Sequence, residues 1–161
     1  MNKNLPLSNI VVLDLTNVLS GPFATQILSD LGAEIIKVEK PNGDDSRKFG
    51  PFIKKRSSYF ISLNRGKKSI VVDFNNEEDK KIFKKLLAIS DVIIDNFKPG
   101  TLEKYGFSSS YLKKNFPLLI QTKISGFGET GPLKENPAYD MIVQAMGGIM
   151  SITGKNKNET Y

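Results

Sequence analysis

The sequence predicts an α/β fold with a doubly wound, mostly parallel sheet of the Rossmann-like kind. Short runs rich in Ile, Val and Leu alternate along the chain with segments of helical periodicity. Loops rich in Gly, Pro and Asn separate these segments. Such alternation is typical of β-α-β crossovers, whose strands are parallel. The chain has 161 residues, of which 39% are hydrophobic and 25% charged, and this suffices for one domain with a sizeable core.

The first thirty residues of this pattern predict one β-α-β unit. Residues 10–15 are apolar and largely β-branched, as expected of a buried strand. Pro22 suits the first turn of a helix, where its missing N–H costs nothing. We expect Gly32 to end this helix and residues 34–39 to form the next strand. The buried side of the helix is predicted to be the apolar stripe Phe23, Ile27, Leu28 and Leu31.

The rest of the chain continues the alternation. Residues 41–58 read as a polar loop, and residues 59–63 as a short strand or turn. Asn75 and Asn76 are good N-cap residues for a helix whose first turn is acidic. The predicted buried face of that helix is Ile82, Phe83, Leu86 and Leu87. The other expected elements are strands over 69–74, 91–95 and 118–124, helical stretches over 102–105, 110–115 and 139–146, and a loop over 126–137.

Composition excludes several kinds of chemistry. The sequence contains no Cys and no His, which rules out disulfides, thiolate or His-ligated metal sites and a Ser-His triad within it. The net charge of +6, carried mostly by Lys, favours anionic partners such as phosphates. With only three Arg, we expect no nucleic-acid partner. No apolar run approaches about 18 residues and no secretory signal is evident, so we expect a cytoplasmic protein without membrane attachment.

The carboxyl ends of the predicted strands indicate where a ligand would bind. In an open parallel sheet these ends share one rim, and the helix at Pro22 would aim its free N–H groups at it. Lysines at or near these ends predict a cleft for a phosphorylated cofactor, although scattered solvated lysines are the alternative. The strand ends are residues 16–20, 39–42, 73–75, 96–100 and 125–128, and the lysines are Lys37, Lys40, Lys98, Lys104 and Lys123.

Two further features have competing interpretations. Residues 126–131 fit G-x-G-x-x-G, but Pro132 and Pro137 follow, so we expect a ligand-approaching loop and not the helix of a dinucleotide fingerprint. Among the carboxylates, Asp14 lies within a strand and is predicted to be structural. Asp73, Asp95 and Asp140 stand where they would either contact a ligand or cap an element.

Several segments together resemble the family III CoA transferases, the formyl-CoA transferase and carnitine CoA-transferase group (CaiB/BaiF type). They occur in family order and with family spacing over nearly the whole chain. The segments are VLDLT at 12–16, GP at 21–22, LGAEIIKVE at 31–39, NRGKKSI at 64–70, DNFKPG at 95–100, YGF at 105–107, SGFGETGP at 125–132, YD at 139–140 and QAMGG at 144–148.

The resemblance implies a binding site for coenzyme A or acyl-CoA on the same rim, without a metal. Lys104 stands where formyl-CoA transferase has arginine, which keeps the charge but loses the bidentate fork. Val72 to Asn75 would line the adenosine pocket. The residues implied are Val18, Leu19, Ser20, Lys40, Val72, Asp73, Phe74, Asn75, Asn96, Phe97, Lys98, Lys104, Pro137, Ala138, Tyr139 and Asp140.

The resemblance also implies the reaction, an acyl-CoA:carboxylate CoA transfer. In the family an aspartate carboxylate attacks the donor thioester, and a mixed anhydride and an enzyme–CoA thioester follow before a carboxylic acid acceptor takes the CoA. That aspartate is expected beyond Tyr161, so no catalytic residue is assigned here. Residues 1–161 would be an incomplete N-terminal CoA-binding domain of an interlocked homodimer, inactive alone.

Four other hypotheses stay open at this point. The α-methylacyl-CoA racemases of the same superfamily use a His-Asp pair where this chain has Tyr139 and Asp140. An NAD-dependent oxidoreductase domain would need a glycine-rich turn after the first strand, which offers only Gly21. A non-catalytic basic module would bind nucleic acid in a salt-dependent way. A remnant without a ligand would aggregate when expressed alone.

Overall fold

A computed structural model describes residues 5–154 of the chain. The chain divides into two compact units, Met1–Ile124 and Ser125–Tyr161, and each is described here by itself. None of the helices in the described part combines the length and the apolar character needed to span a lipid bilayer.

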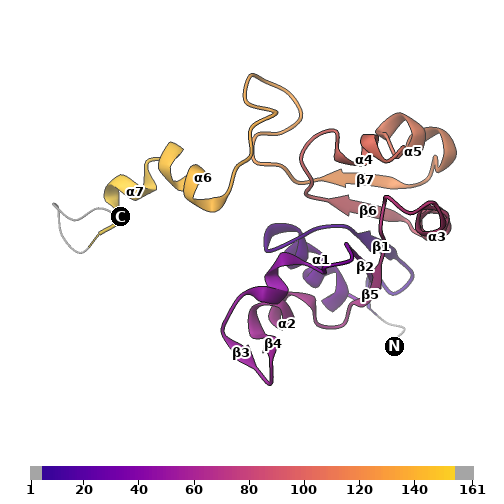
Figure 1. The fold of residues 1–161 in the computed structure, drawn as a ribbon, viewed down its shortest axis with the longest axis horizontal. Helices are drawn as coiled ribbons and strands as arrows, with labels where there is room; N and C mark the ends of the chain where they lie inside the picture. The colour runs from indigo at the N-terminus through magenta and orange to yellow at the C-terminus, as the bar shows by residue number, and fades with distance from the viewer. Residues whose placement is uncertain (1–4, 155–161) are drawn as a thin grey trace. The chain divides into compact units, whose positions relative to one another are not determined.

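The first unit is built on a parallel sheet, as predicted. Among its described residues, five strands pair in the order β5-β2-β1-β6-β7, and every pairing between neighbours is parallel (Figure 1). The strands are β1 (Val11–Asp14), β2 (Glu34–Glu39), β5 (Lys68–Val71), β6 (Val92–Asp95) and β7 (Ile120–Lys123). Because β1 lies in the middle and the chain leaves it in both directions, the sheet is doubly wound.

Helices connect the strands and cover both faces of the sheet. They are α1 (Ser20–Asp30), α2 (Ser58–Asn64), α3 (Glu77–Ala88), α4 (Thr101–Lys104) and α5 (Ser109–Asn115). Between β2 and α2 the chain forms a short 3₁₀ turn, η1 (Asp45–Lys48), and a hairpin of β3 (Phe52–Ile53) and β4 (Arg56–Ser57). The predicted loop over 41–58 therefore contains small elements of its own.

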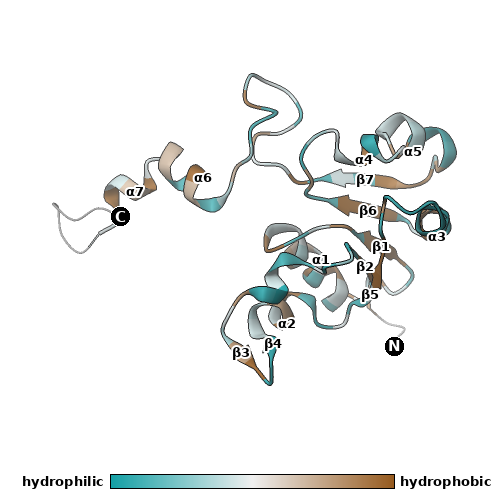
Figure 2. Cartoon of the chain, in the orientation of Figure 1, coloured by the Kyte–Doolittle hydropathy of each residue, from teal (hydrophilic) through white to brown (hydrophobic). Residues whose placement is uncertain are grey.

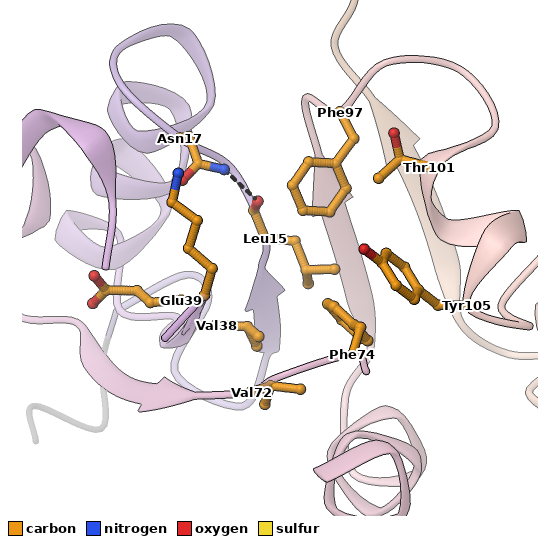
Figure 3. A pocket seen from close by; sticks show the side chains of 10 residues that line it. Leu15, Asn17, Val38, Glu39, Val72, Phe74, Phe97, Thr101 and Tyr105 are labelled. Atoms are coloured by element: carbon orange, nitrogen blue, oxygen red, sulfur yellow. Dashed lines mark hydrogen bonds between the residues drawn. The ribbon is translucent and has the colours of Figure 1, made fainter. Parts of the chain in front are cut away.

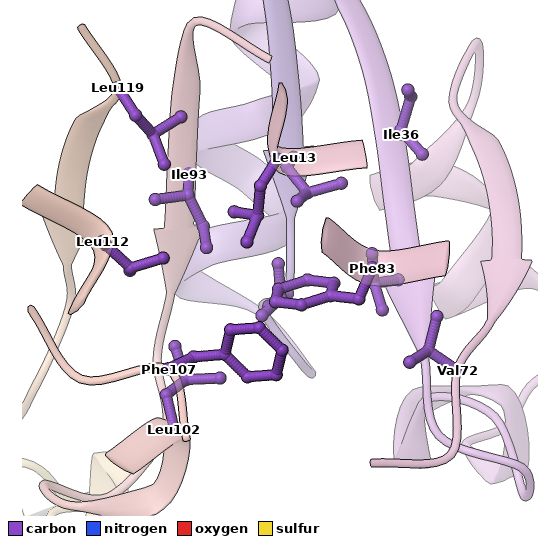
Figure 4. Close-up of a cluster of buried hydrophobic side chains, with 12 residues drawn as sticks. Leu13, Ile36, Val72, Phe83, Ile93, Leu102, Phe107, Leu112 and Leu119 are labelled. Carbon is purple, nitrogen blue, oxygen red and sulfur yellow. The ribbon is translucent and has the colours of Figure 1, made fainter. Parts of the chain in front are cut away.

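Alternation along the central strands separates two hydrophobic clusters. Leu13 of β1 and Ile93 of β6 point to the face covered by α3, α4 and α5, where Phe83 of α3 and Phe107 complete the larger cluster (Figure 4). The side chain of Val12, the neighbour of Leu13 in the strand, points to the opposite face of the sheet. It belongs to the smaller cluster on the side of α1. In Figure 2, strand β6 is strongly hydrophobic while α3 is largely hydrophilic, as expected of a central strand beneath an amphipathic helix.

The prediction for α1 was correct in extent but wrong about its buried face. Phe23, Ile27 and Leu31 are 55%, 45% and 41% exposed, and of the predicted stripe only Leu28 packs against a core cluster. The buried residues are instead Gly21, Pro22, Thr25 and Gln26. The reason is the polar content beneath the helix, since Thr25 donates a hydrogen bond to the buried carboxylate of Asp14.

Helix α3 follows its prediction closely. The Asn76 side chain accepts a hydrogen bond from the N–H of Glu78, and three acidic residues occupy the first turn. Phe83 and Leu87 are buried and Leu86 is partly buried, whereas Ile82 is 41% exposed, contrary to expectation.

The expectation of a strand or turn over 59–63 was wrong, because these residues form α2. Ser57 caps this helix by accepting a hydrogen bond from the N–H of Phe60. The apolar and aromatic residues of this segment resemble a strand by propensity, but the cap fixes a helical first turn.

The second unit begins with the predicted loop over 126–137, followed by α6 (Asp140–Met146) and α7 (Ile149–Ile152). No helix follows the third glycine of the G-x-G-x-x-G match until Asp140. This agrees with the interpretation of the match as a loop and contradicts the dinucleotide fingerprint. Neither α6 nor α7 has a buried residue.

The packing of α3 generates a paired test. We expect Phe83→Ala to lower the free energy of unfolding by about 3–5 kcal/mol, because it opens a cavity at a fully buried site. Ile82→Ala, one position away on the half-exposed side of the same helix, is expected to cost about 1 kcal/mol or less. Urea unfolding measures both, and equal losses would contradict the assigned packing.

Candidate functional site

The turn between β1 and α1 rests on a buried carboxylate. Asp14 is fully buried, and it accepts hydrogen bonds from the N–H of Thr16 at 2.9 Å and from Thr25 Oγ1 at 2.6 Å. Lys67 Nζ lies 3.1 Å from Asp14 Oδ2 and also donates to the carbonyl of Pro22 and the side chain of Asn64. Burial lowers the pKa of the Lys67 ammonium, while Asp14 opposes this shift. The predicted structural role of Asp14 is confirmed.

Glycine at the start of α1 allows this arrangement. A Cβ at Gly21 would lie 2.2 Å from Thr16 Cβ, so only glycine lets the helix begin this close to the end of the strand. The sequence pair Gly21-Pro22 therefore serves the close approach of helix and turn.

Lys37 of β2 and Asp44 of the loop after β2 form a second buried ion pair, which lies against the turn between β1 and α1. Lys37 Nζ is 2.9 Å from Asp44 Oδ2 and donates a 2.7 Å hydrogen bond to the carbonyl of Thr16. The Lys37 side chain is only 1% exposed, so the prediction that it borders the cleft was wrong. The pleat of β2 directs it inward, where it meets an acidic partner. Burial raises the pKa of Asp44, but hydrogen bonds from Ser46 and the charge of Lys37 outweigh it and leave that pKa below its ordinary value.

Glu39, the last residue of β2, gathers several donors. Arg47 donates to its two oxygens from Nε and Nη2, each at 2.6 Å, and the N–H of Asp44 donates at 2.9 Å. Ser69 adds a hydroxyl donor from the neighbouring strand. Burial alone raises the pKa of Glu39, but these hydrogen bonds prevail and lower it to about 2. The carboxylate is therefore a fixed anchor for the loop that contains Asp44.

The buried groups Asp14, Lys67, Lys37 and Asp44 form a charged layer. Above this layer, a pocket of about 180 Å³ opens at the carboxyl ends of the strands (Figure 3). Its lining comes from β2 or from the segments that follow β1, β2, β5 and β6. This is the position predicted for a ligand, at the carboxyl ends of the parallel strands. The lining residues are Leu15, Asn17, Val38, Glu39, Lys40, Val72, Phe74, Phe97, Thr101 and Tyr105. Phe74 and Tyr105 stack with ring centroids 5.2 Å apart. Lys40 is about half exposed and pairs with Asp45 at 2.8 Å.

The pocket contains four of the residues implied by the resemblance, namely Lys40, Val72, Phe74 and Phe97. Val18, Leu19 and Ser20 do not line it, but they directly follow its lining residue Asn17. Leu19 and Ser20 are exposed at the start of α1. Val18 has φ of +69°, in the left-handed region that a β-branched residue rarely adopts.

Asn96 and Asp73 mainly hold backbone in place. Asn96 Oδ1 accepts from the N–H of Asn17 and its Nδ2 donates to the carbonyl of Asn17, both at 2.9 Å, which joins the ends of β1 and β6. Asp73 accepts hydrogen bonds from the N–H and the side chain of Asn75. Asp95 likewise accepts from the N–H of Phe97.

The lysines expected at the rim have different environments. Lys98 and Lys104 are exposed on the segment after β6, outside the pocket lining. Lys123 lies 3.8 Å from Glu103. Of the five predicted lysines, Lys40 alone lines the pocket.

Residues 137–140 belong to the second unit and are described within it alone. Pro137 and Tyr139 are exposed, and Ala138 is half-buried. Asp140 is the first residue of α6 and accepts a hydrogen bond from the side chain of Gln144. This is the position that the helix-start alternative predicted.

The sequence-based predictions included the lining residues Asn17 and Glu39 in the rim ranges 16–20 and 39–42 but missed four others. Thr101 and Tyr105 are spaced by four on and just after α4, a spacing that places two side chains on one helical face and that could have pointed to them. Leu15 and Val38 lie just before two of the predicted strand ends and appeared to be core residues. Only the pairing order of the strands shows that they meet.

A parallel sheet with helices on both faces and a part-aromatic, cation-edged pocket at its carboxyl rim defines a doubly wound α/β protein with a candidate ligand site at the usual place for this fold. Within this class, residues 7–161 match the sequence profile of CoA-transferase family III, and the chain belongs to this family.

Individual relatives agree with this assignment. The chain is 51% identical over 150 residues to the acetyl-CoA:oxalate CoA-transferase of Acetobacter aceti, covering 92% of this chain and 39% of that protein. It is 44% identical over 161 residues to the succinyl-CoA:glutarate CoA-transferase of Homo sapiens, covering 99% and 37%. The crystal structure of a CAIB/BAIF family protein from Brucella suis superposes with a TM-score of 0.91 at 45% identity, covering 99% of this chain and 43% of that one.

The anchor at Glu39 predicts a specific dependence on pH. Its folded-state pKa of about 2 lies below the ordinary 4.5, so its contribution to stability is present above pH 4.5 and is lost as the pH falls toward 2. The pH-dependent part is on the order of 3 kcal/mol. Urea unfolding of the wild type and Glu39→Gln between pH 7 and pH 2 should give a stability difference that shrinks through this window. A difference that stays constant would contradict the lowered pKa.

Proposed function

We propose that the pocket binds the adenosine end of coenzyme A, and that the chain supplies the CoA-binding part of an acyl-CoA:carboxylate CoA-transferase. The observation that carries the proposal is the convergence of Lys40, Val72, Phe74 and Phe97 in one pocket. These residues come from distant parts of the sequence and are among those that the family resemblance implies for CoA.

The chemistry of the lining suits a nucleotide with phosphates. The faces of Phe74, Phe97 and Tyr105 offer flat apolar surface to a purine ring (Figure 3). Lys40 at the edge is held by Asp45 on the surface, an exposed pair that a phosphate can replace at little cost. The first turn of α1 has no side-chain cap, which leaves N–H groups for an anion beside the turn.

The proposed transfer needs a nucleophile outside these residues. We place the aspartate that attacks the donor thioester in a part of the longer family members beyond the position of Tyr161. There its carboxylate would displace CoA from the donor thioester to form the mixed anhydride, and the released CoA thiolate would attack the aspartyl carbonyl, expelling the donor's carboxylate and giving the enzyme–CoA thioester. The interlocked homodimer and the cytoplasmic location belong to the same proposal.

The acceptor class follows from the named relatives. Oxalate and glutarate, the acids in the names of the Acetobacter aceti and human proteins, are dicarboxylic acids. We therefore propose a short dicarboxylate as the carboxylic acid that exchanges CoA in the full-length protein. The racemase alternative lacks its histidine base, because Tyr139 stands at that position and the sequence contains no His.

Binding of CoA tests the pocket. We expect calorimetry to show that the chain binds CoA more tightly than NADH. Lys40→Ala and Tyr105→Ala should each weaken CoA binding about three- to tenfold, because each removes one favourable contact. Lys68→Ala is the matched control, since this lysine is exposed at the opposite end of β5 and pairs with Glu34. Equal affinity for NADH and CoA, or an equal loss in the control, would contradict the proposed site.

A nucleophilic aspartate outside these 161 residues predicts that the chain alone has no transferase activity. The 161 residues incubated with an acyl-CoA and a labelled dicarboxylic acid should form no labelled acyl-CoA, because the aspartate that attacks the thioester is proposed to lie outside them. Chromatography of the products measures this, with a full-length family member as the positive control. Label transfer above the rate without protein would refute the placement of the aspartate.

A further inference from the structure

We propose that Asp44 is a positioning residue, which holds the β1–α1 turn in the conformation that nucleotide binding requires. The inference rests on the proposed function of the pocket and adds to it a residue that does not touch the ligand. Asp44 lies in the loop after β2 and does not line the pocket.

The carboxylate of Asp44 is fully buried and joins two segments. Its Oδ1 accepts a hydrogen bond from the N–H of Val18 at 3.3 Å and two more from the N–H and hydroxyl of Ser46 at 2.8 and 2.7 Å. Its Oδ2 lies 2.9 Å from Lys37 Nζ. One side chain thus connects the turn after β1 with the loop after β2, and both segments contribute to the pocket.

The contact with Val18 matters because of the backbone at that residue. A φ of +69° is unfavourable for a β-branched residue and persists only where the surroundings enforce it. Two groups enforce it here, since Asn96 holds the N–H of Asn17 and Asp44 holds the N–H of Val18. Val18 directly follows the lining residue Asn17 and stands two residues before the start of α1, so its backbone conformation directs the chain from the pocket into the helix.

The buried partner Lys37 determines which variants can test the role of Asp44. Removing Asp44 alone would leave the Lys37 ammonium buried without its acidic partner and would destabilise the fold for that reason. Replacing both charges avoids this. Lys37→Met/Asp44→Asn keeps an oxygen that can accept from the N–H of Val18, whereas Lys37→Met/Asp44→Leu keeps the volume and removes the acceptor.

The two double variants test the inference against the wild type by calorimetry with CoA. We expect the Asn double variant to bind within about threefold of the wild type, and the Leu double variant to bind about tenfold more weakly. Adding Val18→Gly to the Leu double variant should restore most of the affinity, because glycine adopts positive φ without strain. Equal affinities of the two double variants, or no rescue by glycine, would overturn the inference.

Hydrogen exchange at the Val18 amide separates this inference from the proposed function. We expect the amide to be protected in the wild type and the Asn double variant and unprotected in the Leu double variant. If the wild type binds no CoA, the proposed function fails, and the Val18 amide still decides whether Asp44 holds the turn. Equal protection in all three proteins would refute the positioning role, and near-ultraviolet circular dichroism confirms that each variant is folded.

Discussion

The structure depends on a layer of buried charges beneath the β1–α1 turn. Placing Asp14, Lys67, Lys37 and Asp44 away from water costs several kcal/mol for each ion unless every group finds its partners. Here both ammonium groups meet a carboxylate and a backbone carbonyl, and both carboxylates accept backbone N–H groups. These contacts tie strand, turn and helix together in the observed arrangement. The layer therefore fixes where α1 starts and where the loop after β2 returns to the sheet.

The pocket lies on top of this layer and takes its shape from it. Asn17 reaches the pocket from the turn, Glu39 from the last position of β2, and Lys40 from the loop that Arg47 and Asp44 anchor to Glu39. The aromatic wall has a separate origin, because Phe74 and Tyr105 pack through the larger hydrophobic cluster. A rigid polar floor and an apolar wall together suit a ligand with a flat base and charged phosphates. Family III membership agrees with this division, although the chain spans only 37–43% of the length of the relatives compared above.

The polar floor also explains the unusual face of α1. Its buried side carries Thr25 because the Asp14 carboxylate and the Lys67 ammonium lie below it, and the apolar side chains of Phe23 and Ile27 are left exposed. Hydrophobic periodicity identified the helix correctly and its orientation wrongly. Periodicity measures only how apolar residues are spaced, and it assumes that the surface beneath a helix is apolar. That assumption fails wherever a helix packs over buried charges.

The sequence by itself determined the parallel sheet, its strand ends and the capped helix α3, because these depend on local patterns of β-branched residues, caps and turns. It also placed Lys40, Val72, Phe74 and Phe97 at the rim. Only the tertiary structure decided that Lys37 turns inward to Asp44, that residues 59–63 are helical, and that Thr101 and Tyr105 complete the pocket. The inward turn of Lys37 and the completion of the pocket depend on partners far away in the sequence, and the order in which strands pair is not written in any local pattern. Burial of a charge is a property of the whole fold, since a lysine becomes a core residue only when an acidic group from another segment meets it.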